Sequence, residues 1–416
     1  MTDAEHTPEH LALELMCRPD GVSGERLRNV SAHDWSLVQG WAAEHRFAPY
    51  LHYSLSQAGL IDSLPAELAT FLKSRYRNAS LKTLSMQRDM VLVSRLLDGA
   101  GIEHLFMKGP YLAQFAYPEL GLRPMRDIDL LVPSGQAISA FETLQDGGLD
   151  RIAKHKGTPE AFLARSKHLP PLRTREGTNV EVHTLLTSPS EFLRDDLTQW
   201  RFEALSDRII SRTVAGTPIR FPGPEDQLLH LCVHAAIDHQ FNNGPLILSD
   251  VAWLLRTHEI NWPVLWQLAE SQGATRGLAL VLRLVEQEWP GQEVTWVGDT
   301  GAVLPRGAPI LKVAALSLFR SFEARGDVAL EAELASRSGL RSKAISLLSR
   351  VFPTPEKLSR EMPQAANSRL IYAYYPVKWA RLCRRLWSFS RSRFDERARA
   401  DAGNVGQLSN WLRADN

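Results

Sequence analysis

The chain has 416 residues, 44% of which are hydrophobic, and its formal net charge is +1 at pH 7. This length allows two or three compact units, and the near-zero charge excludes a general electrostatic attraction to nucleic acid. The three cysteines, Cys17, Cys232 and Cys383, are odd in number and far apart, so we expect neither a disulfide framework nor a cysteine-ligated zinc site.

The N-terminal sequence MTDAEHTPEH is polar and acidic and contains no apolar signal core. No apolar run in the chain approaches the roughly 20 residues that are needed to span a bilayer. We therefore expect a cytoplasmic protein.

Residues 1–100 are predicted to form an N-terminal helical region. Apolar residues from Trp35 to Trp41 recur at the three-to-four spacing of an amphipathic helix. A long helix should follow and end at Gly99-Ala100-Gly101, because glycine commonly terminates helices. The predicted apolar face of this long helix consists of Leu81, Leu84, Met90, Val91, Val93, Leu96 and Leu97.

Residues 101–222 combine short apolar runs with a helical stretch at 135–145, and this pattern predicts a mixed sheet with helices packed on it. A hairpin is expected around Gly216, between two β-like runs. The predicted strands are 102–107, 128–132, 178–185, 209–214 and 218–221.

The chain returns to helical patterns after Pro222-Gly223-Pro224, and residues 223–300 are predicted to form a helical domain. The glycine- and proline-rich stretch 286–308 marks the predicted boundary to a C-terminal helical region, 301–416. The expected fold class is therefore α+β, with helical regions before and after a sheet-containing core.

The segment 369–399 contains nine Lys or Arg residues, interleaved with aromatic residues. A basic aromatic helix of this kind could lie on an anionic membrane surface or bind a polyanion. Alternatively, its aromatic side chains pack on the protein and its charges face water. We favour this second interpretation slightly, because nothing else in the sequence requires a membrane.

The candidate chemistry centres on Asp127 and Asp129, which open a predicted strand. Side chains two apart on a strand project to the same face, so these two carboxylates should repel each other. A divalent cation resolves the repulsion, and Mg²⁺ shares carboxylate ligands with substrate phosphates. Glu181 lies in a later apolar strand, where an acid is costly to bury unless it is paired or binds metal. We therefore predict a three-carboxylate metal cluster; the alternative is that the Asp pair is ordinary surface charge.

Three motifs together resemble those of an uncharacterised bacterial nucleotidyltransferase family within the DNA polymerase beta-like nucleotidyltransferase superfamily. They are the turn Lys108-Gly109, the run Arg123-Pro124-Met125-Arg126-Asp127-Ile128-Asp129 and the later Glu181-Val182-His183. The similarity covers roughly residues 30–290, including the helices before and after the motifs. It implies that residues 101–222 form a polymerase beta-like nucleotidyltransferase core.

By this resemblance, Asp127 and Asp129 hold Mg²⁺, or Mn²⁺ as the alternative ion, against the phosphates of an NTP, and Glu181 completes a second metal site. Two metals can stabilise both the attacking and the leaving oxygen of an in-line displacement. The arginines that flank the acids could contact the triphosphate, or they could simply neutralise the Asp pair. The candidate nucleotide-binding residues are Lys108, Gly109, Arg123 and Arg126.

The Lys108-Gly109 turn departs from the Gly-Ser that the superfamily normally carries after its first strand. A serine hydroxyl would hydrogen-bond a phosphate, whereas Lys108 can supply a positive charge to it. Gly109 lets the backbone approach a ligand closely. The alternative is that Lys108 is a solvated lysine at the end of a strand.

Two further residues could belong to the site. His183 should share the strand face of Glu181, so it could orient that carboxylate or contact substrate, although we favour a structural role. Asp250 is an acid in an otherwise apolar helix. It could line the cleft or form a salt bridge within the helical domain.

Three histidines lie close together in the predicted helical domain. His230 and His234 have the i, i+4 spacing that can place two imidazoles on one metal ion. No third ligand is apparent, and the dipeptide Asp238-His239 reverses the His-Asp order of HD-type phosphohydrolases. We therefore expect core or helix-surface histidines rather than a metal site.

We predict a metal-dependent nucleotidyltransferase that moves a nucleotidyl group from an NTP to an unidentified acceptor, which could be a small molecule, a protein or RNA. One alternative is a non-catalytic protein that keeps the fold for nucleotide binding or as a scaffold. Another is a toxin-type transferase that modifies tRNA or protein and has a basic groove leading to its cleft. The predicted cluster of three acids favours catalysis, because a scaffold does not need it.

Overall fold

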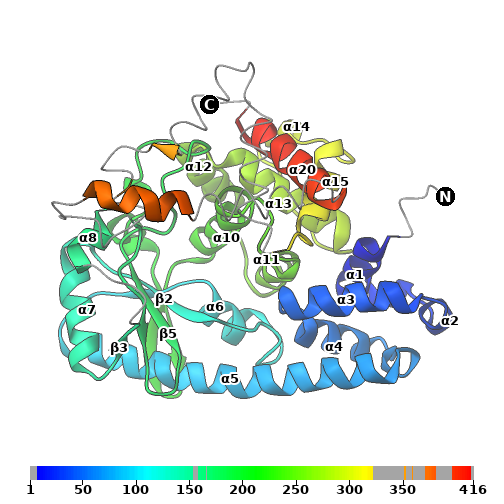
Figure 1. Ribbon diagram of the computed structural model, residues 1–416, viewed down its shortest axis with the longest axis horizontal. Helices are drawn as coiled ribbons and strands as arrows, with labels where there is room; N and C mark the ends of the chain where they lie inside the picture. The colour runs from blue at the N-terminus through cyan, green and yellow to red at the C-terminus, as the bar shows by residue number, and fades with distance from the viewer. Residues whose placement is uncertain are drawn as a thin grey trace.

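The computed structural model describes residues 7–152, 158–164, 166–321, 351–352, 358, 371–380 and 396–413. Figure 1 shows a small twisted sheet with a long helix beneath it, a group of N-terminal helices at one side and a second group of helices above. This arrangement of a mixed sheet with helices before and after it confirms the α+β fold class.

The N-terminal helices are short, and hydroxyl-bearing residues cap several of them. The Ser31 side chain accepts a hydrogen bond from the backbone N–H of Asp34 at the start of α3, which is how serine satisfies a helix N-terminus. Four helices pack together at one side of the sheet (Figure 1): α1 (Pro8–Cys17), α2 (Gly24–Arg28), α3 (Ala32–Glu44) and α4 (Ala48–Gln57).

Helix α5 (Ala66–Gly99) is a single helix of 34 residues that connects the N-terminal helices to the sheet. Its start packs on α4, and its end packs on α7 (Ala137–Asp146). The prediction of this helix and of its end is confirmed, but its predicted apolar face is wrong at Leu81 and Leu84. These side chains are 59% and 49% exposed, because they lie on the solvent face of α5 together with Arg88 and Leu92, whereas Thr83 and Met86 of the same turns are buried.

The sheet has the strand order β1-β2-β5-β4-β3, in which β2 and β5 run parallel and the other pairs run antiparallel. The edge strands contain two residues each, too few to leave a pattern in the sequence, and the predicted strand 102–107 is reduced to Leu105–Phe106. The strands are β1 (Leu105–Phe106), β2 (Asp127–Leu131), β3 (Asp150–Arg151), β4 (Leu172–Arg173) and β5 (Asn179–His183).

Burial alternates along the two central strands, as a half-buried sheet requires. In β2, Ile128 and Leu130 are fully buried, whereas Asp127 and Asp129 point to the opposite, partly open face. In β5, Val180 and Val182 are buried behind the sheet in the same way. Apolar packing behind the sheet therefore fixes which face carries the acids.

A hairpin of β6 (Ile210–Val214) and β7 (Thr217–Phe221) follows, as predicted. Its two turn residues, Ala215 and Gly216, both have positive φ, which matches the twist of a tight two-residue hairpin. Four short helices accompany the sheet and the loops: α6 (Gly109–Tyr111), α8 (Pro159–Leu163), α9 (Phe202–Leu205) and α14 (Thr300–Val303).

The helices above the sheet confirm the predicted return to helical structure after Pro224. One of them, α10, continues as a π-helical turn over His234–Asp238. They are α10 (Pro224–Val233), α11 (Leu246–Thr257), α12 (Trp262–Gln272) and α13 (Thr275–Glu288). Toward the C-terminus, α15 (Pro309–Ser317) packs against α20 (Glu396–Arg413). Across the described ranges, no helix is long and apolar enough to cross a membrane.

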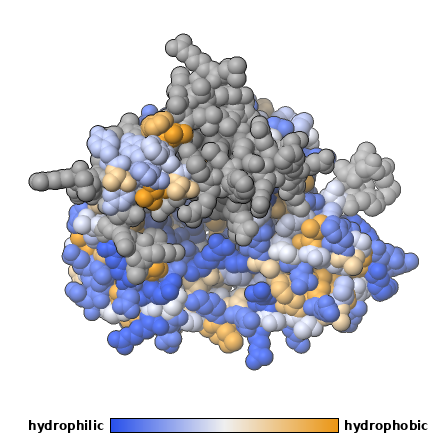
Figure 2. Space-filling view, viewed as in Figure 1, coloured by the Kyte–Doolittle hydropathy of each residue, from blue (hydrophilic) through white to orange (hydrophobic). Residues whose placement is uncertain are grey.

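Figure 2 shows a face that is largely hydrophilic, with hydrophobic groups gathered over the N-terminal helices. The basic aromatic segment 369–399 falls for the most part outside the described residues. Its described stretch 371–380 carries exposed aromatic side chains, with Tyr372 70% and Trp379 38% exposed. Whether this segment contacts a membrane or a polyanion stays a prediction.

Candidate active site

A cavity of about 620 Å³ lies between the open face of the sheet and the helices above it. Its volume is within the range that small-molecule and cofactor sites occupy. Its lining comes from distant parts of the chain: the start of β2, the strand β5, the turn before α6, the helices α10 and α11, and the turn between α3 and α4. All seven residues that the sequence nominated as site residues line this cavity.

Parallel pairing of β2 with β5 creates the acidic end of the cavity. The register sets Asp129 opposite Glu181, so the two carboxylates lie side by side on the open face. His183 follows Glu181 by two residues and faces the same side. Its Nε2 atom lies 3.4 Å from Asp129 Oδ1 and 3.5 Å from Glu181 Oε2. One ligand atom from each of these three residues lies within 4.8 Å of the other two.

Burial and the neighbouring charges shift the pKa values of all three residues in this cluster. Burial raises the pKa of Asp129, but the contact with His183 and the charge of Lys108 outweigh burial and hold that pKa well below its usual range. Burial likewise opposes ionisation of Glu181, yet His183 and His168 lower its pKa. Burial lowers the pKa of His183, and the two carboxylates more than compensate and raise it. The imidazole of His183 thus lies between two carboxylates.

Asp127 lies beside this cluster and is not a member of the three-ligand group. It faces the same cavity two residues before Asp129, and its pKa is raised to about 6 by burial and by the negative charges of Asp129 and Glu181. The three acids therefore share one cavity, as expected from their spacing. The closest grouping, however, joins two of them with His183, which the sequence had favoured as a structural residue.

The Lys108-Gly109 turn lies directly beneath this acidic end. Lys108 Nζ is 3.7 Å from Asp129 Oδ2, and the lysine side chain is only 12% exposed, so it is not the solvated lysine of the alternative interpretation. Its backbone has φ +52°, a conformation that non-glycine residues rarely adopt. Gly109 is needed for a different reason: a Cβ there would lie 3.0 Å from the Arg123 guanidinium and 3.1 Å from Met125 Cγ.

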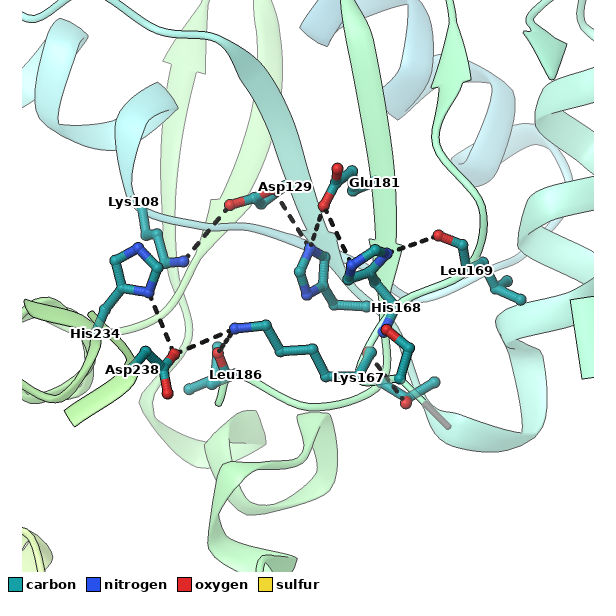
Figure 3. Close-up of polar contacts among 12 residues, drawn as sticks. Lys108, Asp129, Lys167, His168, Leu169, Glu181, Leu186, His234 and Asp238 are labelled. Atoms are coloured by element: carbon teal, nitrogen blue, oxygen red, sulfur yellow. Dashed lines mark hydrogen bonds and ion pairs between the residues drawn. The ribbon is translucent and has the colours of Figure 1, made fainter. Parts of the chain in front are cut away.

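A second polar cluster faces the acids from the opposite wall, as Figure 3 shows. Asp238, in the π-helical turn after α10, is the centre of this cluster. Its Oδ2 atom lies 3.3 Å from Lys167 Nζ and 3.3 Å from His234 Nδ1, and Thr187 donates a hydrogen bond of 2.9 Å to its Oδ1. Next to the acids, His168 Nε2 lies 3.8 Å from Glu181 Oε2.

The two arginines before the acids have different surroundings. Arg123 donates two hydrogen bonds to the carboxylate of Asp250, at 3.2 and 3.1 Å, and Tyr117 donates a third at 2.7 Å. Asp250 therefore both lines the cavity and forms a salt bridge, which joins the two roles that the sequence left open. Arg126 lines the cavity directly next to Asp127.

His230 and His234 do not form a metal site with any third residue in the part of the chain that the structure describes. His230 is 2% exposed, and His234 contacts Asp238 and His239. Burial, followed by the charge of Lys108, lowers the pKa of both imidazoles well below its ordinary value. The expectation of core histidines holds for His230, whereas His234 is part of the cavity wall.

Several residues of the cavity gave no usable signal in the sequence. Lys167 and His168 lie in an irregular segment, and Asp238 was considered only as part of a reversed His-Asp pair. Arg46 stands between two helices of the N-terminal region, more than 60 residues before the first recognised motif. Each reaches the cavity through the tertiary fold alone.

The sequence comparisons agree with this architecture. A family model described as an uncharacterised nucleotidyltransferase matches residues 31–290, which include the N-terminal helices, the sheet and the helices above it. No curated protein sequence matches the chain. The match covers more than half of the 416 residues. The chain therefore belongs to the family of uncharacterised nucleotidyltransferases.

Proposed function

We propose that this protein is a metal-dependent nucleotidyltransferase that moves a nucleotidyl group from an NTP to an acceptor, and that the cavity on the sheet is its active site. One observation carries the proposal: Asp129, Glu181 and His183 bring three ligand atoms within 4.8 Å of one another inside a cavity large enough for a nucleotide. Family membership supplies the class of reaction. The core at 101–222 would supply the acids, and the helical regions around it would close the cavity.

The donor set fits a divalent cation. Carboxylate oxygens suit Mg²⁺ and Mn²⁺, and an imidazole nitrogen in the set favours Mn²⁺ over Mg²⁺. We assign Asp129, Glu181 and His183 as ligands of one ion and Asp127 as the carboxylate that, with Asp129, serves the nucleotide side. When bound, divalent ions in such a site stabilise the charge that develops on the attacking and leaving oxygens.

The other residues of the cavity would position the two substrates and neutralise the negative charge of the phosphates. Lys108 is held by Asp129 at the floor of the cavity, where its ammonium can bind a phosphate oxygen. Because Gly109 has no side chain, Arg123 and Met125 can pack closely against it. Lys167, His234 and Asp238 form a hydrogen-bonded wall opposite the acids, and we propose that this wall orients the acceptor.

A purely structural use of the fold does not account for this arrangement. Asp127 carries a pKa of about 6 because it is buried near two other carboxylates, and such an arrangement costs stability. Proteins retain costly groups of this kind mainly where they bind or react.

Transfer can be tested directly with each of the four NTPs, labelled at the α-phosphate and incubated with the protein, a cell lysate and either Mg²⁺ or Mn²⁺. The proposal predicts that one NTP labels a specific macromolecule or small molecule and that a chelator abolishes labelling. The chemical nature of the labelled product identifies the acceptor class. Absence of labelling with all four nucleotides and both ions would overturn the proposal.

A further inference from the structure

Arg46 is a charged residue of the cavity to which the proposed mechanism gives no role. It lies in the turn between α3 and α4 and lines the same cavity as Asp127 and Asp129. Its Nε and Nη1 atoms are buried and have no hydrogen-bond partner among the described residues. Because a guanidinium carries five N–H donors, burying it without an acceptor costs free energy that a bound anion would recover.

The turn that carries Arg46 is held firmly. Arg46 has φ +61°, a backbone conformation that is sparsely populated outside glycine and that persists only where the surroundings enforce it. Phe47 is fully buried and His45 is 2% exposed. Gly244 packs so closely that a Cβ there would lie 2.7 Å from the Cβ of His45. The backbone of Arg46 is thus held in place beside the cavity.

Two arginines and two aspartates act on the charge of Arg46. Burial and then the charges of Arg126 and Arg123 lower the pKa of Arg46 to about 9, and the charges of Asp127 and Asp250 oppose this to a lesser extent. Asp250 is already engaged by Arg123 through two hydrogen bonds. The three arginines outnumber the two aspartates, so this end of the cavity is complementary to an anionic ligand.

We propose that Arg46 binds the terminal phosphates of the nucleotide, so that the N-terminal helices contribute directly to the nucleotide site. The inference rests on the proposed function, since it assumes that an NTP occupies this cavity. The acidic end would hold the cation and the reacting α-phosphate, and the β- and γ-phosphates would extend toward Arg46. A guanidinium can donate two parallel N–H···O hydrogen bonds to one phosphate. A monophosphate held at the acidic end has no further phosphates to extend toward Arg46, so this contact favours triphosphates.

The test measures binding of inorganic tripolyphosphate, of each NTP and of the matching monophosphates by titration calorimetry, for wild type, Arg46→Gln and Arg46→Lys. Loss of charge-assisted hydrogen bonds should weaken tripolyphosphate and NTP binding by about 10- to 100-fold in Arg46→Gln, with little change for monophosphates. The triphosphate affinity of Arg46→Lys should lie between those of wild type and Arg46→Gln. Lysine keeps the positive charge but lacks the planar guanidinium that donates two parallel hydrogen bonds. Arg28→Gln, an exposed arginine of α2, is the matched control and should bind as wild type.

Equal triphosphate affinity in wild type and Arg46→Gln would overturn the inference. Arg46 would then bind the acceptor or have a structural role. Should Arg46→Gln fail to fold, Arg46→Lys decides: weaker triphosphate binding supports the contact, and unchanged binding overturns it. Failure of the proposed function gives a different result. In that case wild type binds tripolyphosphate through Arg46 and transfers no nucleotide, whereas failure of this inference leaves transfer intact in Arg46→Gln.

Discussion

The two ends of the cavity balance their charges in different ways. At the acidic end, Asp129 and Glu181 share the imidazole of His183, and Lys108 adds a further positive charge. At the basic end, Asp250 satisfies Arg123, whereas Arg46 has two buried nitrogens without a partner among the described residues.

This difference shows what each end is built to bind. At the acidic end, the ligand atoms that a divalent cation would use are already close together. The basic end has an excess of positive charge that the protein itself does not neutralise. A magnesium or manganese nucleotide, with its cation at one end and its terminal phosphates at the other, complements both ends at once.

The largest expected effect concerns the acidic end. Asp129→Asn removes a proposed metal ligand, and because a bound metal supplies several kcal/mol of transition-state stabilisation, transfer should fall at least about 1,000-fold. The variant should still fold, since the carboxylate faces the cavity and not the core. The initial rate of pyrophosphate release measures transfer, and circular dichroism checks that the variant is folded. Glu142→Gln, an exposed acid on α7, is the control and should retain the wild-type rate.

The next prediction concerns the ion pair between Arg123 and Asp250 at the basic end. Asp250→Asn leaves the buried guanidinium of Arg123 without its anion and should lower the free energy of unfolding by about 3 kcal/mol, as measured by urea denaturation. Asp98→Asn breaks the exposed pair with Arg220 and should cost less than about 1 kcal/mol. Similar losses in the two variants would show that Arg123 does not depend on Asp250.

Much of the acidic end could be predicted from the sequence because it depends on local rules. The period-two alternation of β2 and β5 places Asp127 with Asp129 and Glu181 with His183 on common faces. The parallel register that sets Asp129 opposite Glu181 is a long-range property, and it converts the expected three-carboxylate cluster into two carboxylates with His183.

The basic end could not be predicted in the same way. Arg46 reaches the cavity only because α3 and α4 pack beside the sheet, and nothing in the local sequence distinguishes it from a surface arginine. The same kind of long-range effect explains the exposed Leu81 and Leu84: periodicity identifies a helical face, but the neighbouring helices decide how much of that face is covered.

A smaller effect concerns a buried histidine behind the cavity wall. The pKa of His230 lies well below its ordinary value because the imidazole is buried, with Lys108, His234, Lys167 and Asp238 as the charged or titratable groups that act on it. In the unfolded chain its pKa is about 6.5. The unfolded state therefore binds the additional proton on acidification, and stability is present above about pH 6.5 and is lost below it.

The contribution of His230 should be at most about 1.4 kcal/mol per pH unit below this value. Thermal unfolding of wild type and His230→Leu at about pH 7.5 and about pH 5.5 measures it. The variant should lose less stability on acidification than wild type does. The remaining sensitivity comes from the other histidines whose pKa the fold lowers, among them His104, His168 and His234. An identical pH dependence in the two proteins would contradict the assignment of His230 as a buried neutral histidine.

The smallest expected effect tests whether the Lys108 turn is strained for function. Both Lys108→Gly and Lys108→Ala remove the ammonium group, so both should impair NTP binding. Glycine adopts φ +52° freely, whereas alanine does not, so Lys108→Gly should be more stable than Lys108→Ala by roughly 0.5–1 kcal/mol. Urea denaturation of the two variants measures this difference, and a less stable glycine variant would show that the turn is not strained.

The central claim is that the cavity catalyses nucleotidyl transfer, and the most direct test asks which phosphorus atom moves. An NTP labelled at the α-phosphate and the same NTP labelled at the γ-phosphate are incubated in parallel with the lysate and Mn²⁺ or Mg²⁺, using wild type and Asp129→Asn. The account predicts that wild type transfers the α-label to the acceptor and releases the γ-label as pyrophosphate, and that Asp129→Asn does neither. Transfer of the γ-label, or equal transfer by Asp129→Asn, would contradict it.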